Sequence, residues 1–263
     1  MGYVNAIDLN ADLGEGFGQW RMADDAGLLQ VVTSANVACG MHAGDPAILR
    51  DTVRAAAQAQ VAVGAHPGWP DLRGFGRRPW IDADAAEVEA IVLYQLGAFG
   101  ALAQTEGGAV RHVKLHGALA HQCADDVNLA LAAGQAIVHW QALQPSSVPR
   151  AAWLVMPGSA QERACRKLGI RPIFEAYADR AYAADGRLVA RSVSGAVLHE
   201  PHKVAARAVE MVRRQALPTI KGAWLPAPIN SLCVHGDTPG AVEIARAVRA
   251  ALQGAGLRVE APA

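Results

Sequence analysis

Short apolar runs of strand length alternate along this chain with longer segments in which apolar residues recur at helical spacing. The runs typical of strands cover residues 3–10, 34–39, 61–65, 111–115, 151–156, 171–176 and 231–235. Helical spacing predicts helices over residues 24–32, 46–60, 84–105, 125–142, 159–168, 202–215 and 240–253. Because crossover helices join parallel strands, the alternation predicts an α/β fold, either an open doubly wound sheet or a closed barrel.

The alternation runs through the chain with one interruption. Residues 179–201 break it, and the sequence Ala-Asp-Gly within them indicates a hairpin-like excursion over one end of the fold. No linker rich in Pro, Gly or Ser separates two halves, and no internal repeat is visible. We therefore expect a single domain of seven β-α units over residues 1–263, a length that suits one barrel.

Charge and cysteine content narrow the class of function. The chain has 24 Lys plus Arg and 24 Asp plus Glu, so no net field attracts nucleic acid or an anionic membrane. No basic leader and no uninterrupted apolar stretch of about 18 residues is present. The four cysteines lie far apart, which argues against a zinc clasp and against disulfides. We expect a cytoplasmic protein that acts on a small molecule or binds a protein partner.

The unusual polar residues lie just after the predicted strands. They are Asp8, Asn10, Asp12, Glu15, His42, Asp45, His66, Asp71, Lys114, His116, Ser159, Glu175, Asp179, Arg180, His235 and Asp237. In parallel α/β folds the loops after the strands converge at one end, so these side chains are expected to meet in one site. Four of the nine histidines are among them, which favours function over chance placement.

Several of these residues also have a structural explanation. Asp45 precedes Pro46 and can cap a helix, and Asp237 can order the turn before Pro239. Lys114 ends an apolar strand, so it needs a carboxylate, a phosphate or a substrate oxyanion, and an internal ion pair is the structural alternative. The loop GFGRR places two arginines where they suit an anionic group or form a solvated turn. No metal-binding H-x-x-x-H or H-E-x-x-H spacing lies on one predicted helix, and no phosphate-binding P-loop occurs.

A set of longer motifs resembles a known family. The stretches DLNADLGEGFG, SANVACGMHAGDP, VAVGAHPGWPDLRGFGRR, VKLHGAL, YADRAY, GAVLHEP and CVHGDTPGAVE follow one another from residue 7 to about residue 253. Together they resemble the LamB/YcsF family, the A subunits of bacterial ATP-dependent 5-oxoprolinase. The resemblance implies a distorted seven-stranded TIM-like barrel, similar to those of glycoside hydrolases and deacetylases. It also implies that 5-oxo-L-proline, ATP and water give L-glutamate, ADP and phosphate in a complex with B and C subunits.

The resemblance and the strand-end placement together give the expected site. The residues expected to act in catalysis are Asp12, His42, His66, Lys114, His116 and Asp237. Those expected to bind substrate are Asn10, Glu15, Asp45, Asp71, Arg77, Arg78 and His235. The candidate metal ligands are Asp8, Asp12, His42 and His66. The expected cofactor is ATP with Mg²⁺.

Our mechanistic hypothesis gives these side chains separate tasks. A carboxylate or histidine positions the attacking water, and Lys114 stabilises negative charge on oxygen or phosphate. Arg77 or Arg78 holds the substrate carboxylate.

The chain departs from the family pattern at a few positions, and two other functions remain open. Leu115 replaces a common proline, Ala120 and His121 replace a common tyrosine and asparagine, and Trp69 replaces a tyrosine. The missing P-loop indicates that a partner subunit supplies much of the nucleotide site. The alternatives are a self-sufficient metal-dependent deacetylase or amidohydrolase, and a non-catalytic subunit that binds the lactam.

Overall fold

Seven parallel strands form a closed barrel in the computed structural model, which describes residues 5–262. Each strand pairs with the next, and the last pairs with the first. The strands are β1 (Ala6–Leu13), β2 (Ser34–Ala38), β3 (Ala62–His66), β4 (Val110–Lys114), β5 (Ala152–Val155), β6 (Pro172–Tyr177) and β9 (Ser231–Val234). All seven predicted strands are present and the closed form is confirmed. Residues 3 and 4 of the first predicted strand lie outside the described residues.

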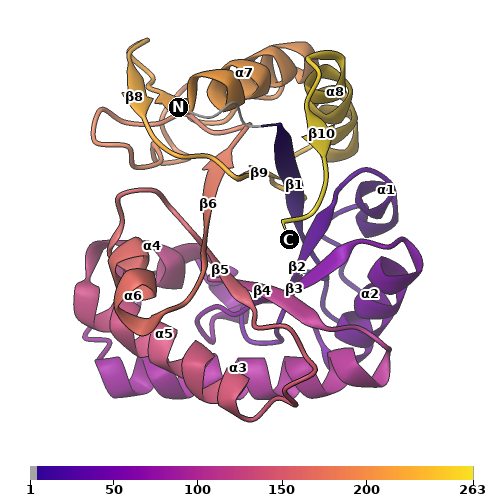
Figure 1. Cartoon of the computed structure of the whole chain (residues 1–263), viewed down its shortest axis with the longest axis vertical. Coiled ribbons are helices and arrows are strands. Elements are labelled where there is room, and N and C mark those ends of the chain that lie inside the picture. Colours follow the sequence, from indigo (N-terminus) through magenta and orange to yellow (C-terminus); the bar gives the residue numbers. More distant parts are fainter. Residues whose placement is uncertain (1–4, 263) are drawn as a thin grey trace.

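Helices surround the barrel on its outer side (Figure 1). They are α1 (Asp25–Leu29), α2 (Pro46–Gln58), α3 (Ala85–Thr105), α4 (Gly117–Asp125), α5 (Val127–Ala142), α6 (Ala160–Leu168), α7 (Pro201–Arg214) and α8 (Ala241–Gly254). The apolar core lies between these helices and the outward-facing residues of the strands. Along β1, for example, Ile7, Leu9 and Leu13 belong to this core, while the alternate residues turn into the barrel.

The sequence analysis did not predict three elements. Helix α4 begins at Gly117 after His116, whose side chain makes no capping hydrogen bond, so no start signal precedes it. It ends at Asp125, and Asp126 then caps α5 through the backbone N–H groups of Asn128 and Leu129. The hairpin of β7 (Ala216–Pro218) and β8 (Trp224–Pro226) and the short β10 (Arg258–Val259) are too brief to show a periodic pattern.

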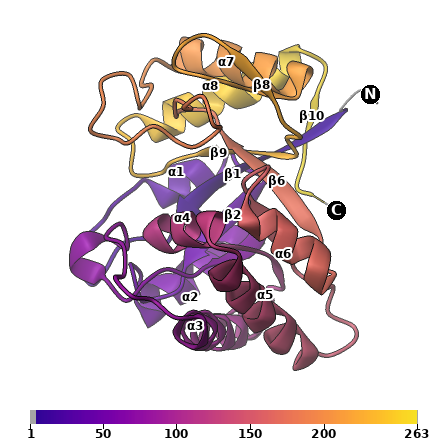
Figure 2. The ribbon, with the colours of Figure 1, turned by 90° about the vertical axis from the view of Figure 1, so that its left-hand side faces the viewer.

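The excursion over residues 179–201 lies over one end of the barrel, between β6 and α7 (Figure 2). It contains only isolated bridges, such as Tyr182 with Leu188. Arg207 of α7 anchors its start by donating hydrogen bonds to the carbonyl oxygens of Tyr177, Ala178 and Arg180. The excursion is therefore a fixed wall at the carboxyl end of the strands.

Helix α3 differs from the others in its composition. It is the one described helix whose length and mean hydropathy, 1.3 over its most apolar window, would suit a membrane span. In the barrel it packs against α5 and contacts β3. Its buried face holds Val88, Leu96 and Phe99, so part of its apolar character serves the core.

Candidate active site

The interior of the barrel is filled with polar side chains. Asp8, Asn10 and Asp12 alternate along β1, and each points inward because strand residues two apart share a face. At the amino end, Asp8 accepts hydrogen bonds from Thr33, Ser34 and Ser231. Burial raises the pKa of Asp8 to about 6, although these hydroxyl groups oppose the shift.

The middle of the barrel holds a continuous hydrogen-bond network. Asn10 donates to Glu175 at 3.0 Å and to Ser231 at 2.7 Å. Asn36 donates to Asn10 and to Asp12, and its own oxygen lies 2.7 Å from Nε2 of His112. His112 is buried within this network.

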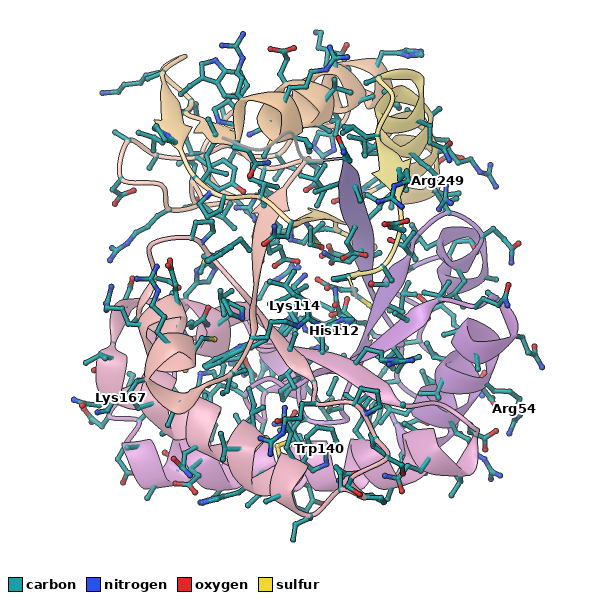
Figure 3. The ribbon with its side chains drawn as sticks, viewed as in Figure 1. Arg54, His112, Lys114, Trp140, Lys167 and Arg249 are labelled. Atoms are coloured by element: carbon teal, nitrogen blue, oxygen red, sulfur yellow. The ribbon has the colours of Figure 1, made fainter. Side chains whose placement is uncertain are left out.

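Lys114 places a buried positive charge inside the barrel, near the carboxyl ends of the strands (Figure 3). Its ammonium group lies 2.8 Å from Asp12 Oδ1 and 3.0 Å from Glu175 Oε1, and it donates to Sγ of Cys233. Burial lowers the pKa of Lys114, but the surrounding acidic groups, Asp12 foremost, together hold the pKa well above its usual value. Lys114 is therefore a permanent cation, only 3% exposed.

Asp12 is the matching anion. Burial raises its pKa, but the neighbouring basic groups, Lys114 foremost, together hold the pKa of Asp12 well below its usual value. The predicted ion pair between a strand-end lysine and a barrel acid is thus present in the structure. Cys233, beside this pair, is a buried thiol whose pKa burial raises well above its usual value, so it is not a nucleophile.

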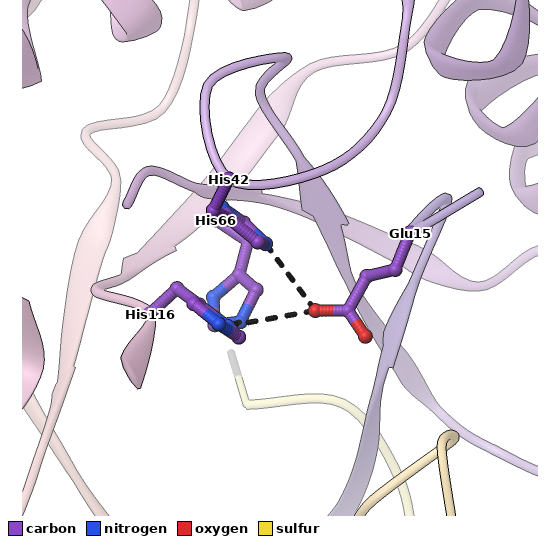
Figure 4. Close-up of side chains that lie close together, drawn as sticks. All are labelled: Glu15, His42, His66 and His116. Carbon is purple, nitrogen blue, oxygen red and sulfur yellow. Dashed lines mark hydrogen bonds and ion pairs between the residues drawn. The ribbon is translucent and has the colours of Figure 1, made fainter. Parts of the chain in front are cut away.

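Above the ion pair, four side chains from four segments form a compact group (Figure 4). We call Glu15, His42, His66 and His116 the upper cluster. One ligand atom of each lies within 4.8 Å of the others, and all four side chains are buried. The rings of His42 and His116 stack at 3.7 Å between centroids.

Burial controls the charge of the upper cluster. It lowers the pKa of His42 and of His116 to about 3, and it lowers the pKa of His66 well below its usual value. It also raises the pKa of Glu15 to about 8. The three imidazoles are therefore neutral at neutral pH, with one lone pair each.

A local backbone feature holds His116 in place. Phe75 adopts the left-handed conformation, with φ of 55°, and its carbonyl oxygen lies 2.8 Å from Nε2 of His116. The next residue, Gly76, also has a positive φ, and a Cβ there would lie 2.7 Å from that of His42. Such strained turns are concentrated at functional sites because only the surrounding structure keeps them in place.

A cavity of about 340 Å³ opens above Lys114 at the carboxyl ends of the strands. Arg77 and Asp237 form an ion pair of 2.6 Å at its edge, and Arg191 lies 3.7 Å from the same carboxylate. Arg180 lines it from the excursion and binds the carbonyl oxygens of Val189 and Ala196. The cavity thus has several guanidinium groups around its rim and one ammonium group below.

His235 and Tyr177 form another wall of the cavity. Nδ1 of His235 lies 3.0 Å from Asp179, and the ring of Tyr177 stacks on that of His235 at 5.2 Å. The charge of His235 lowers the pKa of Asp179 against the opposing effect of burial. Asp179 therefore orients His235 toward the cavity as a fixed carboxylate.

The structure brings most of the predicted site residues together. Those that line the cavity are Asp12, Glu15, His66, Arg77, Lys114, His116, His235 and Asp237. His42 lies behind His116 within the upper cluster, and Asn10 belongs to the network below Lys114.

Four predicted residues lie elsewhere. Asp8 is at the opposite end of the barrel, because β1 extends to Leu13 rather than ending at residue 10, so it does not join the metal candidates. Asp45 caps α2 by accepting from the backbone N–H groups of Ala47 and Ile48, which is its structural explanation. Asp71 pairs with Arg78 outside the cavity, and the side chain of Arg78 is 62% exposed.

Five cavity or network residues had no assigned role in the expected site, although the first three belong to the strand-end set: Glu175, Asp179, Arg180, Tyr177 and Arg191. Three of them follow the sixth predicted strand in the segment YADR, so the strand-end rule that found the others also covers them. Arg191 carries no such signal, because it lies in the middle of the excursion.

The residues that depart from the family motifs are accommodated by the packing around them. Leu115 is buried beside Lys114, and His121 lines the cavity where an asparagine is common in the family. Trp69 is fully buried, donates a hydrogen bond to Gln122 at 2.8 Å, and stacks on Trp80 at 5.3 Å. The loop around Lys114 and His116 therefore closes without the family's proline and tyrosine.

Solved structures support this description of the fold. The crystal structure of a lactam utilization protein from Thermus thermophilus superposes with a TM-score of 0.88 and 41% identity, over 98% of this chain and 100% of that one. A GH113 β-1,4-mannanase shares the fold alone, with a TM-score of 0.51 and 12% identity, over 96% of this chain and 99% of that one.

Sequence comparisons extend the similarity. A protein from Rhodopseudomonas palustris that is named as the A subunit of 5-oxoprolinase is 47% identical over 253 residues, which are 96% of this chain and 97% of that protein. The profile of the LamB/YcsF family matches residues 7–263. The chain therefore belongs to the LamB/YcsF family.

Proposed function

We propose that this chain is the subunit of an ATP-dependent 5-oxoprolinase that binds 5-oxo-L-proline and carries part of its hydrolysis to L-glutamate. The observation that carries the proposal is the cavity above Lys114, which combines a buried cation with a rim of arginines. Its volume of about 340 Å³ lies at the small end of ligand pockets, which suits a five-membered lactam. Family membership and the names of the relatives agree with this choice.

The charges suggest how the lactam lies. Its carboxylate suits the guanidinium groups of Arg180 and Arg191 at the rim, because guanidinium groups match the geometry of carboxylates. Its ring amide then points toward Lys114 on the floor. This assignment replaces Arg78 with residues of the excursion and leaves Arg77 as the partner of Asp237.

Lys114 would supply the electrostatic part of catalysis. The lactam is a resonance-stabilised amide, and negative charge develops on its oxygen, or on a phosphoryl group attached to it, as water attacks the carbonyl carbon before the ring C–N bond breaks. A fixed ammonium group in a buried site stabilises such charge without reorganisation. Asp12 and Glu175 keep the ammonium group charged and hold it in position.

ATP, Mg²⁺ and the partner subunits complete the proposal. The sequence has no P-loop, so a neighbouring subunit is the expected source of the phosphate-binding groups. We assign this role to B and C subunits, which would assemble with the chain in the cytoplasm. The rim of the cavity, with Arg77, Arg191 and Asp237, is the face that such a partner would approach.

A second candidate function rests on the upper cluster. Three neutral imidazoles and a carboxylate resemble the ligand set of a metal-dependent amidohydrolase, which would need neither ATP nor partners. One assay distinguishes the two candidate functions. Glutamate formation from 5-oxoproline is measured with the purified chain, with and without ATP, Mg²⁺ and the B and C proteins.

The proposal expects glutamate only in the complete mixture. Glutamate formed by the chain alone, without ATP, would replace the proposal with the amidohydrolase. No glutamate in the complete mixture, while the three proteins co-elute as a complex, would reject both.

A further inference from the structure

Backbone carbonyl groups fix the tautomers of two histidines in the upper cluster. Nδ1 of His66 lies 2.8 Å from the carbonyl oxygen of Lys114, and Nε2 of His116 lies 2.8 Å from that of Phe75. A carbonyl oxygen only accepts hydrogen bonds, so each of these nitrogens carries a proton. The other ring nitrogens, Nε2 of His66 and Nδ1 of His116, are the ones that face the cluster.

These two nitrogens face one another at a distance of 3.0 Å. Oε1 of Glu15 lies 3.5 Å from Nδ1 of His116 and 3.3 Å from Nε2 of His42. Four possible ligand atoms, one from each side chain, therefore meet at one place.

The geometry points to a binding site for a divalent transition metal ion of the zinc type, held by Glu15, His42, His66 and His116. Zinc bonds of about 2.0–2.1 Å in a tetrahedron place neighbouring ligand atoms about 3.3 Å apart. The three contacts within the upper cluster are 3.0, 3.3 and 3.5 Å. Imidazole and carboxylate ligands also suit zinc better than they suit calcium or magnesium.

The second shell has the form that metal-binding histidines need. A histidine that binds a metal generally donates its other N–H to a carbonyl or carboxylate, which sets its tautomer and orientation. His66 and His116 do so through Lys114 and Phe75. His42 does not, since its Nδ1 is buried without a partner among residues 5–262. His42 is therefore the weakest ligand of the set.

The site has a route to the substrate cavity. Glu15, His66 and His116 line the cavity, whereas His42 is fully buried behind them. An ion held by the upper cluster is thus reachable from the cavity side. This set replaces Asp8 and Asp12 among the metal candidates, because Asp8 is at the far end and Asp12 is occupied by Lys114.

Metal binding can be measured without any activity assay. The full chain, free of any histidine tag and treated with a chelator, is titrated with Zn²⁺ by calorimetry and with Co²⁺ by visible absorption. We expect one ion per chain. Glu15→Gln and His116→Asn should weaken Zn²⁺ binding by about a hundredfold or more, and His42→Gln by less. His139→Gln removes an exposed histidine of α5 and should leave binding unchanged.

A second measurement keeps the proposal testable if a variant fails to fold. X-ray absorption of the zinc-loaded parent protein should show nitrogen and oxygen ligands and no sulfur. Absence of stoichiometric binding, a sulfur ligand, or equal loss in Glu15→Gln and His139→Gln would overturn the proposal. Since the readout is binding, its failure is distinct from a failure of 5-oxoproline turnover, which would count against the proposed function alone.

Discussion

The two ends of the barrel interior are both lined with buried polar groups, but they differ in how these groups are paired. At the amino end, both oxygens of Asp8 accept hydrogen bonds from hydroxyl groups. At the carboxyl end, Nδ1 of His42 is buried without a partner among the described residues. Buried polar groups normally find partners, so this contrast favours the carboxyl end as the place where a ligand binds.

This difference separates two carboxylates of the same strand. Asp8 and Asp12 both point inward from β1, four residues apart. Asp8 is held by three neutral hydroxyl groups, whereas Asp12 is paired with the ammonium group of Lys114. The first arrangement stabilises the barrel, and the second places charge beside a cavity.

Removing Lys114 gives the largest expected effect. Lys114→Met takes away the cation of the cavity floor and should reduce 5-oxoproline turnover by the assembled enzyme about 100- to 1000-fold. It also leaves the buried carboxyl groups of Asp12 and Glu175 without their cation, which costs about 3–5 kcal/mol of the free energy of unfolding. Turnover is measured by glutamate release and stability by urea denaturation.

The double variant separates the two effects of this substitution. Asp12→Asn/Lys114→Met removes both charges of this pair and should recover the part of the stability that Asp12 lost, but not the part due to Glu175, and none of the activity. Recovery of both would mean that Lys114 only supports the fold.

A substitution of Asp8 at the amino end should change how stability depends on pH, and should leave turnover unchanged. Because burial raises the pKa of Asp8 from 3.8 to about 6, the native protein resists ionisation of this group. Its contribution to stability is fully present below pH 3.8 and is lost as the pH rises through 6. Asp8→Asn should therefore gain stability relative to the parent between pH 4 and pH 8, by about 3 kcal/mol.

The measurement is urea denaturation of both proteins across this pH range. A stability difference that stays constant with pH would contradict the assignment. Turnover at pH 7 should be the same for Asp8→Asn and the parent protein.

The free energy of unfolding should fall when side-chain volume is added beside the hydrogen-bond network around His112. A Cβ at Gly64 would lie 2.0 Å from Nε2 of His112, which packs across the barrel on this residue. Gly64→Ala should lower the free energy of unfolding by about 1–3 kcal/mol through overpacking. Gly97→Ala is the matched control, because nothing lies within 4 Å of its added Cβ and alanine favours a helix. Equal melting temperatures for the two variants would refute the packing argument.

The smallest expected effect compares two adjacent arginines. Arg77 lines the cavity and pairs with Asp237, whereas Arg78 pairs with Asp71 outside it. Arg77→Gln should raise the KM for 5-oxoproline several-fold by loosening the rim, an effect of about 1 kcal/mol. Arg78→Gln should leave KM unchanged. Steady-state kinetics of the assembled enzyme distinguish them, and equal KM values would remove Arg77 from the site.

The periodic signals of the strands and of most helices predicted an α/β fold, either open or closed, and the family resemblance supplied the closed barrel. The strand-end rule also located Lys114, His116, His235 and Asp237 correctly at the cavity. It failed for Asp8, because the end of β1 cannot be read where polar and apolar residues alternate past the predicted end at residue 10. Asp45 shows a different failure of the rule. It is also an aspartate that follows a predicted strand, but it serves only as a helix cap.

The sequence could not show which side chains of the site contact one another. Glu15, His42, His66 and His116 lie on four different segments, and only barrel closure brings their atoms within 4.8 Å. The tautomers of His66 and His116 depend on two carbonyl groups, one of them aimed by the left-handed turn at Phe75. No spacing rule encodes such a turn, and Arg191 reaches the rim from a loop without periodic structure.

The most direct test of the account compares one variant from each end of the barrel. Glutamate formation from 5-oxoproline is measured with ATP and the B and C proteins for Asp8→Asn and for Asp12→Asn/Lys114→Met, each confirmed to be folded by circular dichroism. The account predicts parental turnover for the first and about a 100- to 1000-fold loss for the second. Equal turnover by the two variants would contradict the assignment of the active site to the carboxyl end.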